Sequence, residues 1–359
     1  MSAWADRQHL AAPDHMRTLE DLLDFRVDST VAPMRQFLVR LLEQENPEAS
    51  IRSAHRIKKG VHRLAFDVGA TTRSVIFKRL DPDVAHRNQV LVTRWLPAVG
   101  LEHGGPPLLG SVAEPDGERI WHVYEDLGEM TLDSDPTDMV RVEESLRLIA
   151  AVHGRFAGHA LLGECRLWGG DLGMPFYHSN AVDGIRALEA LDPAGWRPVH
   201  RTARHTLLET LQEMLDNGAQ IASLLAEQGG PETLLHGDLW RQNVLLVPAG
   251  QDEFRPRLID WDHVGVGQVS YDLSTLLSRF ASSERHTVLE MYRQEMSPAG
   301  WQLPDSRILN RLFDAAERAR IANRVIWPAV EIRFGSQMEW ALDHLVELSQ
   351  WFDRIEPVL

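Results

Sequence analysis

The feature that most constrains this chain is the segment 236–243, HGDLWRQN, together with the two short apolar segments after it. Residues 244–247 are VLLV, which is typical of a buried strand, and a turn-rich connection leads to a second short apolar segment that ends immediately before Asp260. This pattern predicts a β-hairpin. Because a hairpin brings its two outer ends together, we expect Asp238, Asn243 and Asp260 to lie close to one another.

The side chains at these three positions indicate a particular chemistry. Two carboxylates and one amide present hard oxygen atoms, which suit Mg²⁺ with retained waters, whereas zinc would prefer His and Cys. In phosphoryl transfer, one carboxylate orients and deprotonates the attacking hydroxyl, and an amide and a second carboxylate hold Mg²⁺ on the nucleotide phosphates. A single Asp or Asn is most often a turn or cap residue, so the prediction depends on the whole pattern.

Several other chemistries lose support because their motifs are absent. The chain has 34 Arg but only three Lys, at positions 58, 59 and 78, and it has no Gly-Lys dipeptide, so a Walker-A loop is impossible. The motifs G-x-G-x-x-G, H-E-x-x-H and G-x-S-x-G are also absent. The single Cys165 excludes a disulfide framework and a Cys-rich zinc site, and one thiol fits a reducing cytoplasm.

Composition and charge set limits on the partners. With 359 residues, 44% hydrophobic and 25% charged, the chain can bury a sizeable core in two or three domains or in one large two-lobed domain. The net charge of −15 argues against nucleic acid or an anionic membrane as the main partner. Residues 1–127 carry 16 basic and 18 acidic side chains, whereas residues 128–359 carry 21 and 34. Such acidity is typical of a solvated face; the alternative is a pocket for a cationic, polyamine-like substrate.

The secondary-structure pattern changes along the chain. Helical spacing in residues 1–50 predicts an N-terminal helical extension. Residues 51–127 are strand-rich, with predicted strands at 64–68, 74–79 and 119–124 and one predicted helix at 84–96. Residues 128–359 are mostly helical, with predicted helices at 138–157, 203–228, 271–280, 284–296, 305–326 and 337–355. No apolar run is long enough to span a membrane and the N-terminus lacks a continuous apolar core, so we expect a cytoplasmic protein.

The stretches HGDLWRQNVLL and LIDWDHVGVGQVSYDLS resemble the aminoglycoside phosphotransferase and choline kinase-like family, which has the protein-kinase fold. The resemblance covers roughly residues 51–281. It implies an α+β, two-lobed architecture, with a small β-rich N-lobe at 51–127, a large helical C-lobe at 128–359, and ATP bound in the cleft with Mg²⁺. GTP in place of ATP stays open, and no pattern in the sequence assigns an oligomeric state.

The resemblance also assigns roles residue by residue. Asp238 matches the catalytic base, and Asn243 and Asp260 match the Mg²⁺ ligands. Three further residues match positions that support this site: they are His236, which begins the catalytic loop, Asp272, which braces that loop from the next helix, and Asp262, which is secondary. The stretch AVHG resembles the end of a helix in relatives, where we expect its histidine, at position 153, to have a core or capping role.

The nucleotide-binding residues are expected in the first lobe. Lys78 matches the lysine that binds the α- and β-phosphates; the alternative is an edge-strand lysine that points to water. Gly60 is the one glycine of the expected phosphate-covering loop, and the backbone of Glu125 and Leu127 would pair with the base. The family's usual Glu partner of the lysine is absent from residues 79–101. The ammonium group of Lys78 would then be held by an amide such as Asn88 or Gln89, by a Glu elsewhere, or by the nucleotide itself.

The predicted function is an ATP-dependent small-molecule O-kinase. The acidity of the helical part favours a cationic acceptor such as an aminoglycoside, another basic antibiotic or an amino sugar, while a neutral sugar, a nucleoside antibiotic or an amino alcohol stays open. Candidate acceptor contacts, each of which is more often core or a solvated face, are Trp168, Trp196, Trp261, Trp327, Trp340, Glu331, Glu339 and Asp343. A protein kinase is disfavoured because the loop reads H-G-D and no D-F-G occurs. A catalytically inactive kinase-fold binding protein is the alternative from another class.

Overall fold

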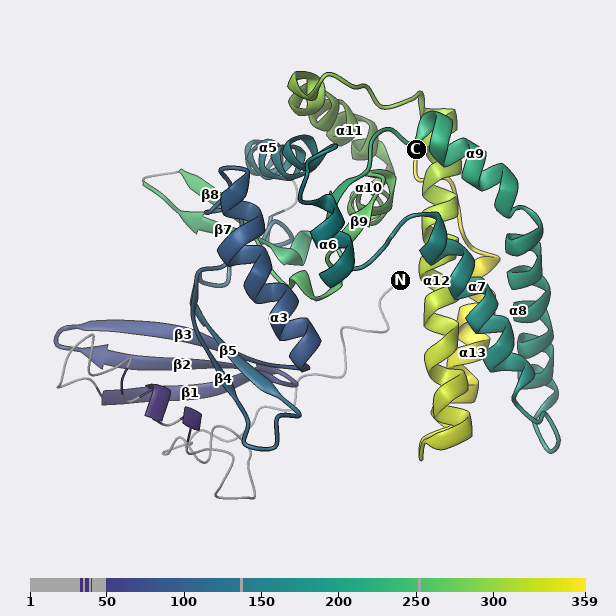
Figure 1. Ribbon diagram of the computed structural model, residues 1–359, viewed down its shortest axis with the longest axis horizontal. Helices are drawn as coiled ribbons and strands as arrows, with labels where there is room; N and C mark the ends of the chain where they lie inside the picture. Colours follow the sequence, from purple (N-terminus) through teal and green to yellow (C-terminus); the bar gives the residue numbers. More distant parts are fainter. Residues whose placement is uncertain (1–32, 35, 39, 41–49, 136–137, 251–252) are drawn as a thin grey trace. The chain divides into compact units, whose positions relative to one another are not determined.

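The computed structural model describes residues 33, 34, 36–38, 40, 50–135, 138–250 and 253–359 (Figure 1). The chain divides into two compact units, of which the smaller comprises Met1–Gln89 with Pro106–Leu127 and the larger comprises Val90–Gly105 with Gly128–Leu359. The helical extension predicted for residues 1–50 lies largely outside the described residues. In the part of the chain that the structure describes, no helix is both long and apolar enough to cross a membrane.

The smaller unit is built on a five-stranded antiparallel sheet with the strand order β1-β2-β3-β5-β4. Its strands are β1 (Ser50–Lys58), β2 (Val61–Val68), β3 (Thr71–Leu80), β4 (Leu108–Ala113) and β5 (Ile120–Glu125). Helix α3 (Pro82–Val90) follows β3 directly. Alternate residues of the inner strands, such as Phe66, Phe77 and Val123, are buried together in one apolar cluster with Met34 and Leu38. The alternation places these side chains on one face of the sheet and their sequence neighbours on the other.

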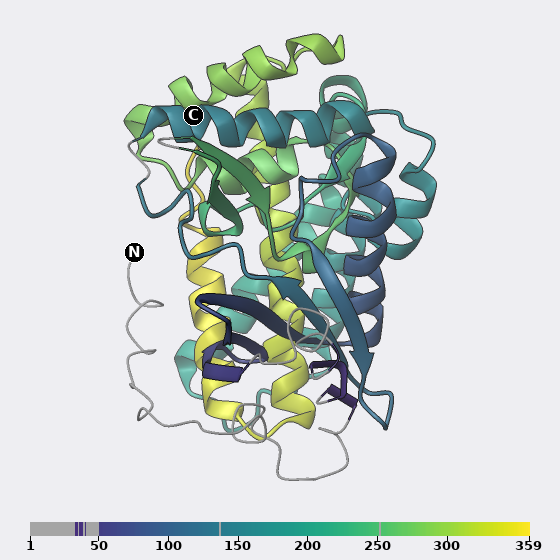
Figure 2. The same cartoon turned by 90° about the vertical axis from the view of Figure 1, so that its left-hand side faces the viewer.

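The larger unit is mainly helical (Figures 1 and 2). Its helices are the π-helical η1 (Leu91–Trp95), then α4 (Leu96–Ala98), α5 (Met139–Phe156), α6 (Leu162–Trp168), α7 (Met174–Glu189), α8 (Pro198–Asp216), α9 (Gly218–Gln228), α10 (Ser270–Leu277), α11 (Ser282–Met296), α12 (Ser306–Phe334) and α13 (Met338–Phe352). Two short antiparallel pairs complete it: β6 (Thr233–Leu235) with β9 (Gly265–Gly267), and β7 (Val244–Pro248) with β8 (Phe254–Leu258). The second pair is the predicted hairpin.

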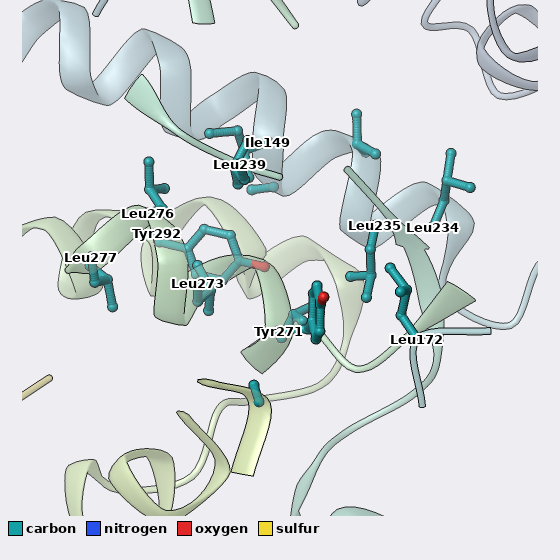
Figure 3. Close-up of a cluster of buried hydrophobic side chains, with 14 of the residues drawn as sticks. Ile149, Leu172, Leu234, Leu235, Leu239, Tyr271, Leu273, Leu276, Leu277 and Tyr292 are labelled. Atoms are coloured by element: carbon teal, nitrogen blue, oxygen red, sulfur yellow. The ribbon is translucent and has the colours of Figure 1, made fainter. Parts of the chain in front are cut away.

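The helices of the larger unit pack around two separate hydrophobic cores. Helices α7, α8, α12 and α13 pack on one another around Leu188, Leu211 and Leu345, and in Figure 2 the yellow helices α12 and α13 run side by side. The other core lies around α5, α10 and α11, and Figure 3 shows Leu235 and Leu239 of the central loop region within the same cluster as Tyr292. Buried, closely packed side chains therefore anchor the loop that carries Asp238.

Two helix boundaries differ from the sequence-based prediction. Residues 203–228 form not one helix but two, α8 and α9, which are separated at Asn217. The helix predicted at 305–326 continues as α12 through Pro328 to Phe334. Pro328 is buried in the packed interior, and contacts of α12 with α7 and α13 hold the helix together where the proline removes one backbone hydrogen bond.

Candidate active site

The segment 236–243 forms a tight loop that leads from β6 to β7 and ends in the 3₁₀ turn η2 (Arg241–Asn243). The backbone N–H of Trp240 donates to the carbonyl of Asp238 at 2.9 Å, and the N–H of Asn243 donates to the carbonyl of Trp240 at 2.9 Å. The Asn243 side chain donates from Nδ2 to the Asp238 carbonyl at 2.8 Å. These bonds close the loop on itself, so that the Asp238 and Asn243 side chains leave the backbone a short distance apart.

The amide of Asn243 has a defined orientation. A carbonyl oxygen only accepts hydrogen bonds, so the atom of Asn243 that lies 2.8 Å from the Asp238 carbonyl must be the nitrogen. The other arm of the amide is then the oxygen Oδ1, which is the only atom of this side chain that can coordinate a cation. The loop geometry thus presents Asn243 in the form that a metal ligand requires.

The hairpin brings Asp260 to the same place. Val244 of β7 pairs with Leu258 of β8, and the N–H of Ile259 donates to the carbonyl of Asn243 at 2.9 Å. Asp260 follows with φ of 63° and ψ of 50°, and among the described residues it is the one non-glycine residue with positive φ. This left-handed conformation is costly for an L-residue, and such strain is concentrated at functional sites.

His236 ties the loop and the end of the hairpin together. Its Nε2–H donates to the carbonyl of Ile259 at 2.8 Å, and its Nδ1 accepts from the N–H of Asp238 at 3.3 Å. The ring is 1% exposed and lies 4.5 Å, between centroids, from the Trp261 indole. Both contacts require the neutral tautomer with the proton on Nε2. Burial lowers the pKa of His236 against the raising effects of the nearby Asp272, Asp238 and Asp260 charges, in agreement with a neutral ring.

The lowered pKa of His236 predicts how stability depends on pH. In the unfolded chain His236 takes up a proton below its ordinary pKa of 6.5, but in the folded protein it does so only at lower pH. Its contribution is therefore fully present above pH 6.5 and is lost as the pH falls, by up to about 1.4 kcal/mol per pH unit. Urea unfolding between pH 7 and pH 5 should show a shallower pH dependence for His236→Gln than for the wild type. An unchanged slope in His236→Gln would contradict the assignment.

Asp272, at the start of α10, fixes the backbone of the loop by hydrogen bonds. Its carboxylate accepts the backbone N–H of His236 at 2.7 Å and that of Gly237 at 2.9 Å. It also accepts the Nε2–H of His153 at 3.2 Å, and Nδ1 of His153 accepts the Tyr292 hydroxyl at 2.8 Å. Burial alone would raise the pKa of Asp272, but the His153 hydrogen bond and the neighbouring charges outweigh it and lower the pKa.

Gly237 is required by its surroundings. Its φ is +81°, and a Cβ at this position would lie 1.9 Å from the carbonyl oxygen of His263. No other residue fits between these backbones without displacing the segment that follows Asp260. The glycine therefore permits the close approach of the two chain segments that carry Asp238 and Asp260.

The donor set fits magnesium better than a metal that needs only protein ligands. Among the described residues, no three His, Cys, Asp or Glu side chains lie close enough to hold a metal ion. Mg²⁺ does not need such a cage, since it usually binds through one or two carboxylates together with phosphate and water oxygens. One amide oxygen on Asn243 and the carboxylate on Asp260 match that requirement.

The predicted nucleotide-binding residues lie in the smaller unit. Lys78 is half-buried on β3, in register with Val61 of β2 and His122 of β5. Because β3 is the central strand, the alternative of an edge-strand lysine is wrong. Lys78 and the buried Phe77 point to opposite faces of the sheet. On the helix after β3, Asn88 is buried.

The three other predicted nucleotide-binding positions lie at a turn and near a strand end. Gly60, with φ of +73°, forms the turn between β1 and β2, where its carbonyl accepts the Arg79 N–H at 2.8 Å. Glu125 ends β5, and its N–H donates to the Pro107 carbonyl at 3.0 Å. Leu127 is the last residue of the smaller unit. The structure thus puts Lys78, Gly60, Glu125 and Leu127 in one unit and the loop residues in the other.

Sequence reasoning missed Asp126, whose side chain ties the end of β5 to β2 and β3. Both oxygens of the Asp126 carboxylate are used: Arg63 Nε lies 2.6 Å from Oδ2, and the Ser74 hydroxyl donates to Oδ2 at 2.7 Å while Arg63 Nη2 donates to Oδ1 at 3.1 Å. An aspartate between Glu125 and Leu127 is the only sequence signal for this contact. It fixes the backbone whose polar groups were predicted to pair with a base.

Two of the proposed acceptor contacts, Glu331 and Asp343, have structural partners. Glu331 accepts the backbone N–H groups of Ser336 and Gln337, each at 2.8 Å, after the end of α12. Asp343 pairs with Arg197 at 2.8 Å and with His200 at 3.0 Å. Trp196 and Trp261 are buried, whereas Trp168, Trp327 and Trp340 are exposed, as is Glu339. These contacts favour the structural interpretation of Glu331 and Asp343.

One unit is β-rich and carries a lysine on its central strand, and the other is helical and carries this loop and hairpin. Together these features define a phosphotransferase of the protein-kinase-like fold. The sequence matches the Phosphotransferase enzyme family over residues 53–305, which is more than half of the chain, and the chain therefore belongs to this family. Among curated proteins, none is significantly similar to the chain. The family transfers phosphoryl groups to hydroxyl groups of small molecules, so the chain is an enzyme of that class, as its motifs predicted.

Solved structures agree on the fold. An ethanolamine kinase of Plasmodium vivax is 9% identical with a TM-score of 0.59, covering 92% of this chain and 90% of its own. A choline kinase of Streptococcus pneumoniae is 14% identical with a TM-score of 0.51, covering 89% and 99%. An aminoglycoside phosphotransferase of Streptomyces rimosus, in complex with ADP and streptomycin, is 18% identical with a TM-score of 0.50, covering 80% and 98%. At these identities the likeness shows the protein-kinase-like fold alone.

Proposed function

We propose that this protein transfers the γ-phosphate of ATP to a hydroxyl group of a small molecule, with Asp238 as the base. The observation that carries the proposal is the set of bonds that link three residues: Asn243 donates to the Asp238 carbonyl, and its own carbonyl accepts the N–H of the residue before Asp260. In the proposed reaction, Asp238 orients the acceptor hydroxyl and takes its proton as the oxygen attacks phosphorus in line. Positioning and charge neutralisation supply most of the acceleration.

Asn243 and Asp260 would hold Mg²⁺ through Oδ1 and a carboxylate oxygen. When bound, the ion neutralises charge on the phosphate oxygens of the nucleotide. His236 and Asp272 act on this site indirectly, because they fix the backbone on which Asp238 stands. Asp262 follows Asp260 in the 3₁₀ turn η3 (Trp261–His263) and is proposed as a secondary support.

The smaller unit would supply the nucleotide contacts. Lys78 would bind the α- and β-phosphates, Gly60 would let a turn approach them closely, and the backbone at Glu125 and Leu127 would pair with the base. The similar structures include complexes with ADP and with GDP, which supports a purine nucleotide, and we propose ATP with GTP as the alternative.

We propose a cationic acceptor. The support is the charge of residues 128–359, with 21 basic and 34 acidic side chains, together with the acceptors named for the similar structures. Streptomycin, choline and ethanolamine are all cations that carry hydroxyl groups. An aminoglycoside, another basic antibiotic or an amino sugar fits this description. An amino alcohol shares the positive charge, whereas a neutral sugar or a nucleoside antibiotic does not.

The decisive experiment is an acceptor panel read by ADP release. With Mg-ATP, we expect turnover with at least one of kanamycin, streptomycin, choline or glucosamine at a kcat/KM well above that for glucose and uridine. The same reactions with Mg-GTP and with EDTA test the nucleotide and the metal. A preference for the neutral acceptors would remove the charge argument, and nucleotide binding without ADP release from any acceptor would favour the inactive binding protein.

A further inference from the structure

Two arginine–aromatic pairs join the loop of Asp238 to the residues that follow α10. The guanidinium carbon of Arg279 lies 3.5 Å from the centre of the Trp240 ring, and that of Arg241 lies 5.0 Å from the centre of the Phe280 ring. Two adjacent residues of the loop thus stack reciprocally on two adjacent residues after the helix. Trp240 is fixed to the loop by its N–H bond to the Asp238 carbonyl, so the stack ties Arg279 to the loop that carries the proposed base, whose charge acts on Arg279.

The two arginines differ in how their charge is neutralised. Arg241 forms an ion pair with Asp133 at 2.7 Å. In the part of the chain that the structure describes, Arg279 forms no ion pair with a carboxylate, and its buried Nε has no hydrogen-bond acceptor. Burial lowers the pKa of Arg279, and the charges of Arg324 and Arg241 add to this effect. A half-buried guanidinium without an anion is costly, which indicates that a bound group completes the site.

The charges around Arg279 indicate which group that is. The side chains whose fields act on it are Glu317, Arg324, Asp238 and Arg241. Glu317 is already paired with Arg320 and accepts the Ser274 hydroxyl at 3.1 Å. A cationic acceptor would be repelled by Arg279, so the missing anion is not the acceptor. In the proposed reaction the other group at Asp238 is the transferred phosphoryl group, and the planar N–H array of arginine suits phosphoryl oxygens.

We infer that Arg279, held over the Trp240 ring, donates hydrogen bonds to the phosphoryl group during transfer and is a catalytic residue of this enzyme. The inference rests on the proposed function. As the acceptor oxygen bonds to the γ-phosphorus, its proton passes to Asp238, and the bond from phosphorus to the β–γ bridging oxygen breaks with its electron pair leaving on ADP. Arg279 keeps its proton throughout and stabilises the charge on the non-bridging phosphoryl oxygens.

The first test is the effect of Arg279→Gln on turnover. We expect kcat to fall by about 10²-fold with every acceptor that the wild type phosphorylates, while the acceptor KM stays within about twofold. Arg279→Lys should recover part of kcat because it keeps the charge but not the planar array. Trp240→Leu should lower kcat in the same direction, since it removes the platform. Arg307→Gln, which removes an exposed arginine near the start of α12, is the matched control and should leave kcat unchanged.

The second test measures binding without turnover, using Mg-ADP and the magnesium complex of the ATP analogue AMP-PNP. We expect Arg279→Gln to bind Mg-ADP as the wild type does and to lose about tenfold in affinity for the analogue, which carries the γ-phosphoryl group. The melting temperature of Arg279→Gln establishes that this variant is folded.

The outcomes separate the inference from the proposed function. A higher acceptor KM with unchanged kcat would show that Arg279 contacts the acceptor and would overturn the inference, as would unchanged kinetics and unchanged analogue binding in Arg279→Gln. In either case a wild-type enzyme that turns over leaves the proposed function standing. A wild type that binds neither nucleotide would overturn both.

Discussion

Asp238→Asn should lose turnover almost completely while Mg-nucleotide binding is retained. Asparagine keeps the size and the loop contacts, because Asp238 bonds to the loop through its backbone carbonyl and N–H. It cannot accept the proton of the acceptor hydroxyl at neutral pH. A general base contributes about 10²–10⁴-fold, so kcat should fall by that factor, as measured by ADP release with the best acceptor of the panel. The dissociation constant of Mg-ATP, measured by titration calorimetry, should change by less than about threefold.

The control for this variant is Asp353→Asn, which makes the same chemical change at an exposed residue after α13. It should keep the wild-type kcat. Retention of more than a tenth of the wild-type kcat in Asp238→Asn would refute the role of base. Loss of nucleotide binding together with kcat would instead indicate that the loop itself had been disturbed, which the melting temperature would reveal.

The site was predictable because its information is local. Asp238, Asn243 and Asp260 lie within 23 positions of one another along the chain, and a single hairpin between them is enough to bring them together. The apolar run at β7 and the turn-rich connection fix that hairpin without any long-range contact. The resemblance to a known family added the roles, which the geometry alone does not assign.

Two of the strands that sequence reasoning missed share a physical cause. β1 and β4 are the two edges of the five-stranded sheet, and neither has a fully buried residue in its described part. An edge strand packs against one neighbour only, so it needs no strong apolar alternation and gives a weak pattern. The break between α8 and α9 has a local signal in the sequence, the dipeptide Asn217–Gly218, which is typical of a turn.

Contacts between distant parts of the chain could not be read from the sequence. The stack of Arg279 on Trp240 joins positions 39 residues apart, and the bond between His153 and Asp272 joins positions 119 apart. Neither contact has a periodicity or a motif, since each depends on how helices pack around the loop. In the same way, the pairing of Asp343 on α13 with Arg197 and His200 depends on the packing of α13 against α8.

The largest expected loss of stability is that of Asp272→Asn. The wild-type carboxylate is fully buried and accepts two backbone N–H groups of the loop and the Nε2–H of His153. An asparagine has only one accepting oxygen, so its NH₂ group would face a backbone donor and leave at least one buried N–H without a partner. Unsatisfied buried donors and lost charge-assisted bonds together cost about 3 kcal/mol in the free energy of unfolding, which urea denaturation followed by tryptophan fluorescence would measure.

Asp305→Asn is the matched control for this loss, because Asp305 is an exposed N-cap whose oxygen accepts one backbone N–H, that of Ile308, at 3.0 Å. Asparagine caps helices about as well as aspartate, so its free energy of unfolding should stay within about 0.5 kcal/mol of the wild type. The pH dependence gives an independent check. Since the pKa of Asp272 is lowered in the folded protein, its contribution is present above its ordinary pKa of 3.8 and is lost as the pH falls further. If Asp272→Asn unfolded at the same urea concentration as Asp305→Asn, the loop would be held by other contacts, and the brace from α10 would not be what positions Asp238.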